Sequence, residues 1–173
     1  MTMPAQKPGS SKQDYQTPPE FLSAVKRRLG IQDFHYDLAA SAENSVVRYA
    51  SGNVVEEGYF SEDDDALSVN WAECYDGEED TMWMYLNPPY ADISPWVQKC
   101  AEESARGAHI TCLVPASTGA NWFKSYVYNK AYTIFLNGRI TFVGASGPYP
   151  KDCMLLLYTP YIRGGFDVWT WNK

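Results

Sequence analysis

The chain has 173 residues, 45% of them hydrophobic and 20% charged, and its formal net charge is −7. These values predict one globular domain with a sizeable core over residues 15–173, after a disordered polar tail over residues 1–14. The apolar runs are too short to span a membrane, the N-terminus lacks the apolar core of a signal peptide, and the four cysteines form no C-x-x-C pair. We therefore expect a soluble cytoplasmic protein without a membrane span, a zinc site or a disulfide framework.

The negative charge is concentrated in the middle of the chain. Residues 31–80 carry one basic and fourteen acidic side chains, whereas residues 1–30 and residues 81–173 each have a net charge of +3. This distribution leaves room for a basic face that contacts nucleic-acid phosphates and for an acidic pocket that takes a cation. A solvated acidic loop without any partner is an equally good explanation of the acidic segment.

The first half of the chain predicts one helix and two short strands. In "TPPEFLSAVKRRLG" (17–30), Thr17 is the expected N-cap, Glu20 completes a capping box and Gly30 ends the helix. The segment "FHYDLAA" (34–40) predicts a short strand that runs into small residues. The acidic, glycine-interrupted residues 51–80 predict mostly loop with one short strand.

The second half predicts strands separated by helices. "TMWMYL" (81–86) predicts a strand that two prolines end, because proline donates no backbone hydrogen bond. A helix capped by Ser94 follows, and the apolar run "AHITCLVPA" (108–116) is typical of a strand buried in a parallel sheet. The remaining predictions are a helix at 119–130, an Asn-Gly hairpin at 132–143 and strands at 153–158 and 166–171.

This order of elements predicts an α/β fold with a mostly parallel sheet and an antiparallel edge hairpin. Ligands of such sheets bind at the carboxyl ends of the strands. Asp37 and Ala39 lie at the end of one predicted strand, and Asn87 and Tyr90 lie at the end of another. We therefore expect these residues to face one crevice.

The tetrapeptide Asn87-Pro88-Pro89-Tyr90 after an apolar strand resembles motif IV of the S-adenosylmethionine-dependent methyltransferases that modify amino groups of planar systems. An exocyclic amine of a base is a poor nucleophile, because its lone pair is delocalised into the ring. The Asn87 side-chain oxygen and the Pro88 carbonyl could accept its two hydrogens and free the lone pair. Tyr90 would stack on a base flipped out of the duplex. An ordinary Asn-Pro turn is the alternative explanation.

A wider resemblance covers residues 15 to about 158. The blocks that carry it are "YQTPPEFLSAVKRRLG", "FHYDLAASAENSVVRYAS", "DDDALSVNW", "MYLNPPYADISPWVQKCAEES", "CLVPASTGANWF" and "NGRITF". Together they resemble the bacteriophage-type DNA N6-adenine methyltransferase family (Dam-type, phage or prophage encoded). The resemblance implies a Rossmann-like methyltransferase fold and methyl transfer from S-adenosylmethionine to adenine in double-stranded DNA, at GATC-like sites, in the cytoplasm of a bacterial host.

The resemblance also implies a set of site residues and no metal. The catalytic residues would be Asn87, Pro88, Pro89 and Tyr90. The cofactor-binding residues would be Thr17, Pro18, Asp37, Ala39, Ala40, Asn44, Asp65 and Leu67. Apart from the resemblance, the candidate DNA-binding residues are Arg139, beside the predicted hairpin turn, and Trp96.

Several of these residues have a simpler structural explanation. Asp37 could cap a loop, and Asp65 is one of four consecutive acidic residues that could form a solvated face. Trp96 at a helix position favours a place in the core over a base platform, and Arg139 could contact phosphate or cap the sheet edge. Small residues, Ala39 to Ser41, stand where many methyltransferases have a glycine-rich turn, which leaves the cofactor affinity open.

The alternatives for the activity are methylation of cytosine N4 or of protein glutamine by the same fold, and a non-enzymatic protein whose acidic segment mimics DNA. Nothing in the sequence indicates an oligomeric state.

Overall fold

The computed structural model of the protein describes residues 15–47, 49–51, 54–56, 58–74 and 81–172. The predicted disordered tail, residues 1–14, lies outside these ranges. In the described part of the chain, no helix has the length and apolar character needed to cross a membrane.

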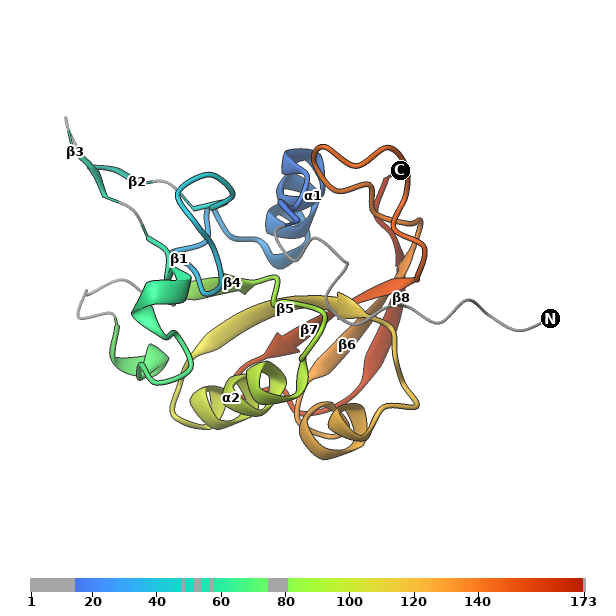
Figure 1. Ribbon diagram of the computed structural model, residues 1–173. Coiled ribbons are helices and arrows are strands. Elements are labelled where there is room, and N and C mark those ends of the chain that lie inside the picture. The colour runs from blue at the N-terminus through green and yellow to red at the C-terminus, as the bar shows by residue number, and fades with distance from the viewer. Residues whose placement is uncertain (1–14, 48, 52–53, 57, 75–80, 173) are drawn as a thin grey trace.

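A six-stranded sheet in the order β1-β4-β5-β7-β6-β8 forms the centre of the fold (Figure 1). Strands β1, β4 and β5 run parallel, β7 runs antiparallel to both β5 and β6, and β8 runs parallel to β6. This mostly parallel sheet with antiparallel pairs confirms the predicted Rossmann-like α/β class. The strands are β1 (Tyr36–Asp37), β4 (Trp83–Leu86), β5 (His109–Pro115), β6 (Tyr132–Asn137), β7 (Cys153–Tyr158) and β8 (Phe166–Thr170).

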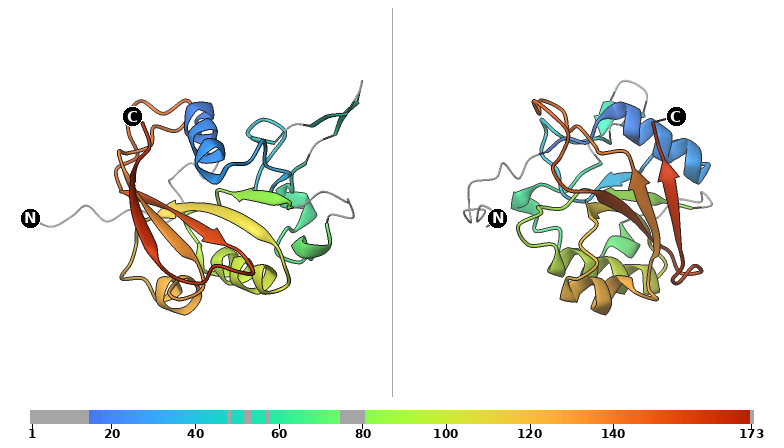
Figure 2. Two further views of the ribbon diagram at one scale, coloured as in Figure 1. Left: turned by 180° about the vertical axis from the view of Figure 1, so that it is seen from behind. Right: turned by 90° about the vertical axis from the view of Figure 1, so that its right-hand side faces the viewer.

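Helices cover both faces of the sheet. Helix α1 (Pro19–Leu29) lies on one face, and α2 (Ser94–Ala105) lies on the other with the π-helical turn η3 (Phe123–Val127) (Figure 1, Figure 2). The two-stranded sheet of β2 (Tyr49–Ser51) and β3 (Val54–Glu56) extends beyond the β1 edge. The 3₁₀ turns η1 (Glu62–Asp64) and η2 (Trp71–Glu73) complete the described elements.

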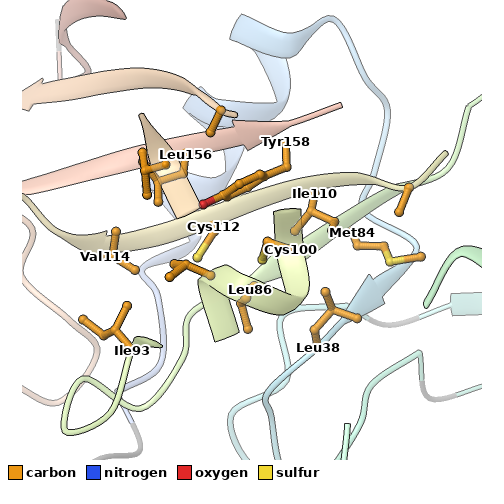
Figure 3. Packing of buried hydrophobic residues seen from close by; sticks show 14 of the residues in the cluster. Leu38, Met84, Leu86, Ile93, Cys100, Ile110, Cys112, Val114, Leu156 and Tyr158 are labelled. Carbon is orange, nitrogen blue, oxygen red and sulfur yellow. The ribbon is translucent and has the colours of Figure 1, made fainter. Parts of the chain in front are cut away.

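The strands pack apolar side chains against both helical layers, because successive residues of a strand point to opposite faces. On the α2 side, Figure 3 shows Cys100 among Leu86, Ile110 and Cys112. On the α1 side, Tyr85 and Leu113 pack with the apolar face of the helix. The alternation places Tyr85 on one face and its neighbours Met84 and Leu86 on the other.

The start of α1 differs from the prediction. The helix begins at Pro19 with Pro18 as its N-cap residue, and no side-chain capping bond forms at this end within the described residues. The predicted Thr17 cap and capping box are therefore wrong, because the Thr17 hydroxyl has a tertiary partner, the hydroxyl of Tyr85 at 2.8 Å. The predicted end is confirmed, since Gly30 adopts the left-handed conformation at φ 70° that favours glycine.

The predicted hairpin at 132–143 is also wrong. Strand β6 already pairs with β7 on one side and β8 on the other, so no edge remains for a partner after Asn137-Gly138. Residues 139–143, all within the described chain, form no strand. Ile140 and Phe142 produce the alternating pattern because they are buried in the core on the α1 side.

Three smaller predictions need adjustment. The described part of residues 51–80 has two 3₁₀ turns and, with Tyr49–Ser51, a pair of short strands where we expected one strand. The helix expected at 119–130 is reduced to a short segment that contains η3. Helix α2 includes Ser94, and Ile93 takes the N-cap position, a shift of one residue.

Candidate functional site

A cavity of about 400 Å³ opens at the carboxyl ends of β1 and β4. The two strands pair in parallel with Asp37 opposite Tyr85, so Asp37, the last residue of β1, and Asn87, the first residue after β4, lie at neighbouring strand ends. Both line this one cavity, where the strand order led us to expect them. The other predicted site residues in its wall are Thr17, Ala39, Ala40, Asn44, Pro89 and Trp96.

Asn87 has one half of its amide bonded and the other half free. Its Nδ2 donates a hydrogen bond to the main-chain carbonyl of Tyr15 at 2.8 Å. Its Oδ1 is buried and has no hydrogen-bond partner among the described residues. A buried acceptor without a donor is costly in a folded protein, so a ligand that brings an N–H group to Asn87 gains the bond that the protein leaves unmade.

Asp37 is buried as well, with 3% of its surface exposed. The Val46 main-chain N–H donates to its Oδ2 at 3.0 Å. Burial raises the pKa of Asp37 from 3.8 to about 6, because desolvation outweighs the hydrogen bonds from the main-chain N–H groups of Val46 and Ala39. No basic side chain is among the described lining residues, so the carboxylate has no counter-charge in the cavity wall.

The loop after β1 shapes the wall with small side chains. The Ala40 N–H donates to the Phe60 carbonyl at 3.0 Å, and the Ser41 N–H donates to Asn44 Oδ1 at 2.6 Å. Ala39, Ala40 and Ser41 all line the cavity. Side chains of this size keep the backbone close to the cavity without a glycine-rich turn.

The described cavity lining does not include Tyr90, although its neighbour Pro89 belongs to it. The Tyr90 ring packs edge-on against Phe142 and Tyr149, with centroids 6.3 Å and 5.6 Å away, and its hydroxyl donates to the Leu113 carbonyl at 3.4 Å. Burial raises the pKa of the Tyr90 phenol well above its ordinary value, so the hydroxyl stays protonated. Pro88 is buried.

Four further predicted residues do not reach the cavity. Asp65 is exposed and has a positive φ of 44°, and Arg139 is an exposed residue whose Nε donates to Asp152 Oδ1 at 3.2 Å. Pro18 is buried and Leu67 is half-buried. The described lining includes none of these four residues.

Six lining residues were not among the site residues predicted from the sequence. Tyr85 was within reach, because it lies two residues before Asn87 and residues two apart share a strand face. Phe60 and Ser61 reach the cavity through the non-local pairing of β1 with residues 58–60, which no local pattern predicts. The six residues are Tyr15, Ser41, Val46, Phe60, Ser61 and Tyr85.

Among the described residues, no group of three or more His, Cys, Asp or Glu side chains could hold a metal ion. The four cysteines all lie in the described part of the chain and are free thiols.

Comparison with known proteins gives two matches. The family model described as DNA N-6-adenine-methyltransferase (Dam) matches residues 5–162. A DNA N-6-adenine-methyltransferase of Escherichia phage T1 is 28% identical over 134 residues, which are 78% of this chain and 49% of the phage protein. The chain thus spans about half the length of the curated relative that it matches.

Proposed function

Since the chain belongs to the DNA N-6-adenine-methyltransferase (Dam) family, we propose that it transfers a methyl group from S-adenosylmethionine to the N6 amine of adenine in double-stranded DNA. The adenine would be flipped out of the duplex to reach the cavity. The observation that carries the proposal is that two residues in the lining of one cavity have incomplete polar groups: Asn87, whose buried Oδ1 has no hydrogen-bond partner among the described residues, and Asp37, whose carboxylate is buried.

The cavity wall suits the proposed cofactor. S-adenosylmethionine supplies, when bound, an electrophilic methyl group on a positively charged sulfonium. Asp37 is the candidate for the positive charges of this molecule, because its carboxylate is buried without a counter-charge. The small side chains of Ala39, Ala40 and Ser41 leave room beside it. Thr17 and Asn44 line the same cavity, so they remain candidates for cofactor contacts.

Asn87 would prepare the amine for attack. With Nδ2 bonded to the Tyr15 carbonyl, Oδ1 is the amide atom left to accept an amine hydrogen. The Pro88 carbonyl is the proposed acceptor for the second hydrogen. Acceptors that hold both hydrogens favour a tetrahedral nitrogen, whose lone pair is no longer delocalised into the ring. The protein's contribution is therefore mainly positioning of the acceptor amine.

The flipped base needs an apolar surface to replace the stacking that it loses. Trp96 lines the cavity, and Tyr90 directly follows the lining residue Pro89. We assign the stacking role to Tyr90 and a supporting role in the cavity wall to Trp96. Arg139, which is exposed and lies on the segment after β6, is the candidate for a phosphate contact.

The test is a mass measurement on DNA. The protein is incubated with unmethylated duplex DNA and methyl-deuterated S-adenosylmethionine, and the DNA is digested to nucleosides and weighed. Labelled N6-methyladenine is the expected product, and sequencing of the methylated sites then tests the GATC-like recognition that the family resemblance implies.

The other products overturn parts of the proposal. Labelled N4-methylcytosine would keep the mechanism and change the base. Label on protein glutamine instead of DNA would change the substrate class. Absence of label from both DNA and protein, together with no binding of the cofactor, would favour a non-enzymatic, DNA-mimicking protein.

A further inference from the structure

We propose that Tyr15 is a positioning residue, which holds the Asn87 amide in the orientation that presents oxygen, and not nitrogen, to the acceptor amine. This inference rests on the proposed function, because it assigns a cause to the orientation on which the proposed chemistry depends.

Residues 15–17, which we call the N-terminal strap, connect strand β4 to the segment after β6. The Tyr15 carbonyl accepts from Asn87 Nδ2 at 2.8 Å, and the Thr17 hydroxyl bonds to the Tyr85 hydroxyl at 2.8 Å. The Gln16 carbonyl accepts from the Val143 N–H at 3.0 Å. The strap therefore fixes main-chain atoms directly beside the Asn-Pro-Pro-Tyr motif.

A main-chain carbonyl can only accept hydrogen bonds, so it selects one of the two amide orientations. An asparagine amide has an accepting oxygen and a donating nitrogen on opposite sides, and its terminal torsion is broad and roughly two-fold. With Nδ2 on the Tyr15 carbonyl, Oδ1 is left as the free acceptor. In the reversed orientation the amide would present N–H groups to an amine that must itself donate, and the complex would be repulsive.

A substitution of Tyr15 changes its side chain and leaves its main-chain carbonyl in place, so the test must act through the side chain. Its ring stacks on Phe142 with centroids 5.2 Å apart and an interplanar angle of 27°. Phe142 is buried, with 2% of its surface exposed, and gives this contact a rigid base. Loss of the ring should release the carbonyl from Asn87, whereas loss of the hydroxyl alone should not.

The decisive experiment compares two backgrounds, Asn87 and Asn87→Asp. A carboxylate presents an accepting oxygen in either orientation, so it has no orientation to lose. We expect Tyr15→Ala to lower the single-turnover methylation rate about 10-fold in the Asn87 protein at saturating cofactor and less than about twofold in Asn87→Asp. Tyr15→Phe should stay within about twofold of the parent. An equal loss from Tyr15→Ala in both backgrounds would show that Tyr15 acts independently of the amide and would overturn the proposal.

Thr17→Val is the matched control in the same strap. Its hydroxyl contacts Tyr85 rather than Asn87, so its effect, whatever its size, should be the same factor in both backgrounds. A Thr17→Val effect that depended on residue 87 as strongly as that of Tyr15→Ala would contradict a specific role for Tyr15. Calorimetric binding of S-adenosylhomocysteine to each variant separates changes in cofactor affinity from changes in rate.

A spectroscopic readout is independent of activity. The side-chain NH₂ signal of Asn87 in an amide NMR spectrum is assigned by its loss in Asn87→Asp. We expect this signal to be protected from exchange in the parent and in Tyr15→Phe and unprotected in Tyr15→Ala. Equal protection in all three proteins would overturn the orientation lock even if the parent methylated DNA. Failure of the parent to methylate DNA would instead refute the proposed function, and the NMR measurement would still test the lock.

Discussion

Asn87 and Asp37 occupy equivalent places at the ends of two neighbouring strands, yet the protein leaves them incomplete in different ways. Asn87 is neutral, and among the described residues no donor bonds to its Oδ1. Asp37 has a donor, the Val46 N–H at 3.0 Å, but the described lining of the cavity offers it no counter-charge. The first group gains most from a ligand that brings an N–H, and the second gains most from a ligand that brings a positive charge.

From this difference we expect the two residues to have separate functions. Changes at Asn87 should alter the rate of methyl transfer with little effect on cofactor affinity. Changes at Asp37 should alter cofactor affinity more than the rate at saturation. If substitutions at Asn87 and Asp37 changed rate and cofactor affinity in the same proportion, the two residues would not have separate functions.

The largest effect is expected for Asn87→Ala. Removal of one group that stabilises a transition state costs roughly 100-fold to 1,000-fold in rate, so methyl transfer should fall by at least about 100-fold. Binding of S-adenosylhomocysteine, measured by calorimetry, should stay within about threefold of the parent.

Asn70→Ala is the matched control for this loss. The Oδ1 of Asn70 is also buried without a hydrogen-bond partner among the described residues, but Asn70 precedes η2 and is absent from the described cavity lining. Its substitution should leave the methylation rate within about twofold. Equal losses at the two positions would mean that the free oxygen of Asn87 is a packing defect and not a catalytic acceptor.

The next largest effect is expected at Tyr90, whose substitution tests the proposed contact with the flipped base. Stacking of a base on an aromatic ring is worth about 1–3 kcal/mol, so Tyr90→Ala should lower kcat/KM for DNA roughly 5-fold to 150-fold. Tyr90→Phe should cost about twofold or less, because the hydroxyl makes only a 3.4 Å bond to the Leu113 carbonyl.

Thermal melting must accompany these rates, because Tyr90 also packs against Phe142 and Tyr149. The stacking role predicts that Tyr90→Ala reduces kcat/KM at temperatures well below its melting point. Equal losses from Ala and Phe, with both proteins folded, would contradict a role based on the ring.

The proximity of Asp37 and Asn87 could be predicted from the sequence, because each lies at the end of a predicted strand and the carboxyl ends of parallel strands share one edge of a sheet. The contacts of the strap residues could not be predicted in this way. Thr17 has the local signature of an N-cap, but a hydroxyl partner on β4 replaces the cap. Tyr15 and Phe60 reach the site through contacts with segments distant in the chain, to which local propensity is blind.

The hairpin at 132–143 failed for a related reason. Alternation of apolar residues marks one buried face, and it does not say whether a strand partner exists. Ile140 and Phe142 bury that face against the core although they belong to no strand. Prediction from sequence therefore succeeded where geometry follows from strand order and failed where it depends on which partner is still available.

Asp37→Asn should reveal the cost of the missing counter-charge. The folded-state pKa of about 6 lies above the ordinary 3.8, so the folded protein binds this proton more tightly than the unfolded chain. Asp37 is therefore unfavourable for folding above about pH 6, by up to about 3 kcal/mol, and this cost disappears as the pH falls toward 4. Melting curves should show Asp37→Asn more stable than the parent at about pH 8 and equal to it near pH 4.

Asp37→Asn should weaken cofactor binding, although it stabilises the fold. Without the carboxylate, affinity for S-adenosylhomocysteine should fall about 10-fold at pH 8. In the parent, affinity should decline as the pH falls through about 6, and Asp37→Asn should lack this decline. Asp65→Asn is the matched control, because Asp65 is exposed at φ 44°, a conformation that asparagine tolerates. A comparable loss of affinity in Asp65→Asn would assign the cation to Asp65.

The smallest effect is expected for Arg139→Gln, which should touch neither half of the cavity. Arg139 follows β6 and pairs with the Asp152 side chain. The main-chain carbonyl of Asp152 accepts the N–H of Ala116, directly after β5, at 2.9 Å. Arg139 therefore lies at the end of the sheet where the cavity opens. Arg163 is exposed between β7 and β8 at the opposite end, because β7 ends beside the start of β5. If DNA lies over the cavity, Arg139→Gln should weaken duplex binding about 3-fold and lower the slope of log affinity against log salt by about 1, while Arg163→Gln should leave both unchanged. The ion pair with Asp152 limits the size of this loss, so Asp152→Asn should strengthen duplex binding. Equal effects of the Arg139 and Arg163 substitutions would mean that these charges attract DNA without contacting it at a defined position.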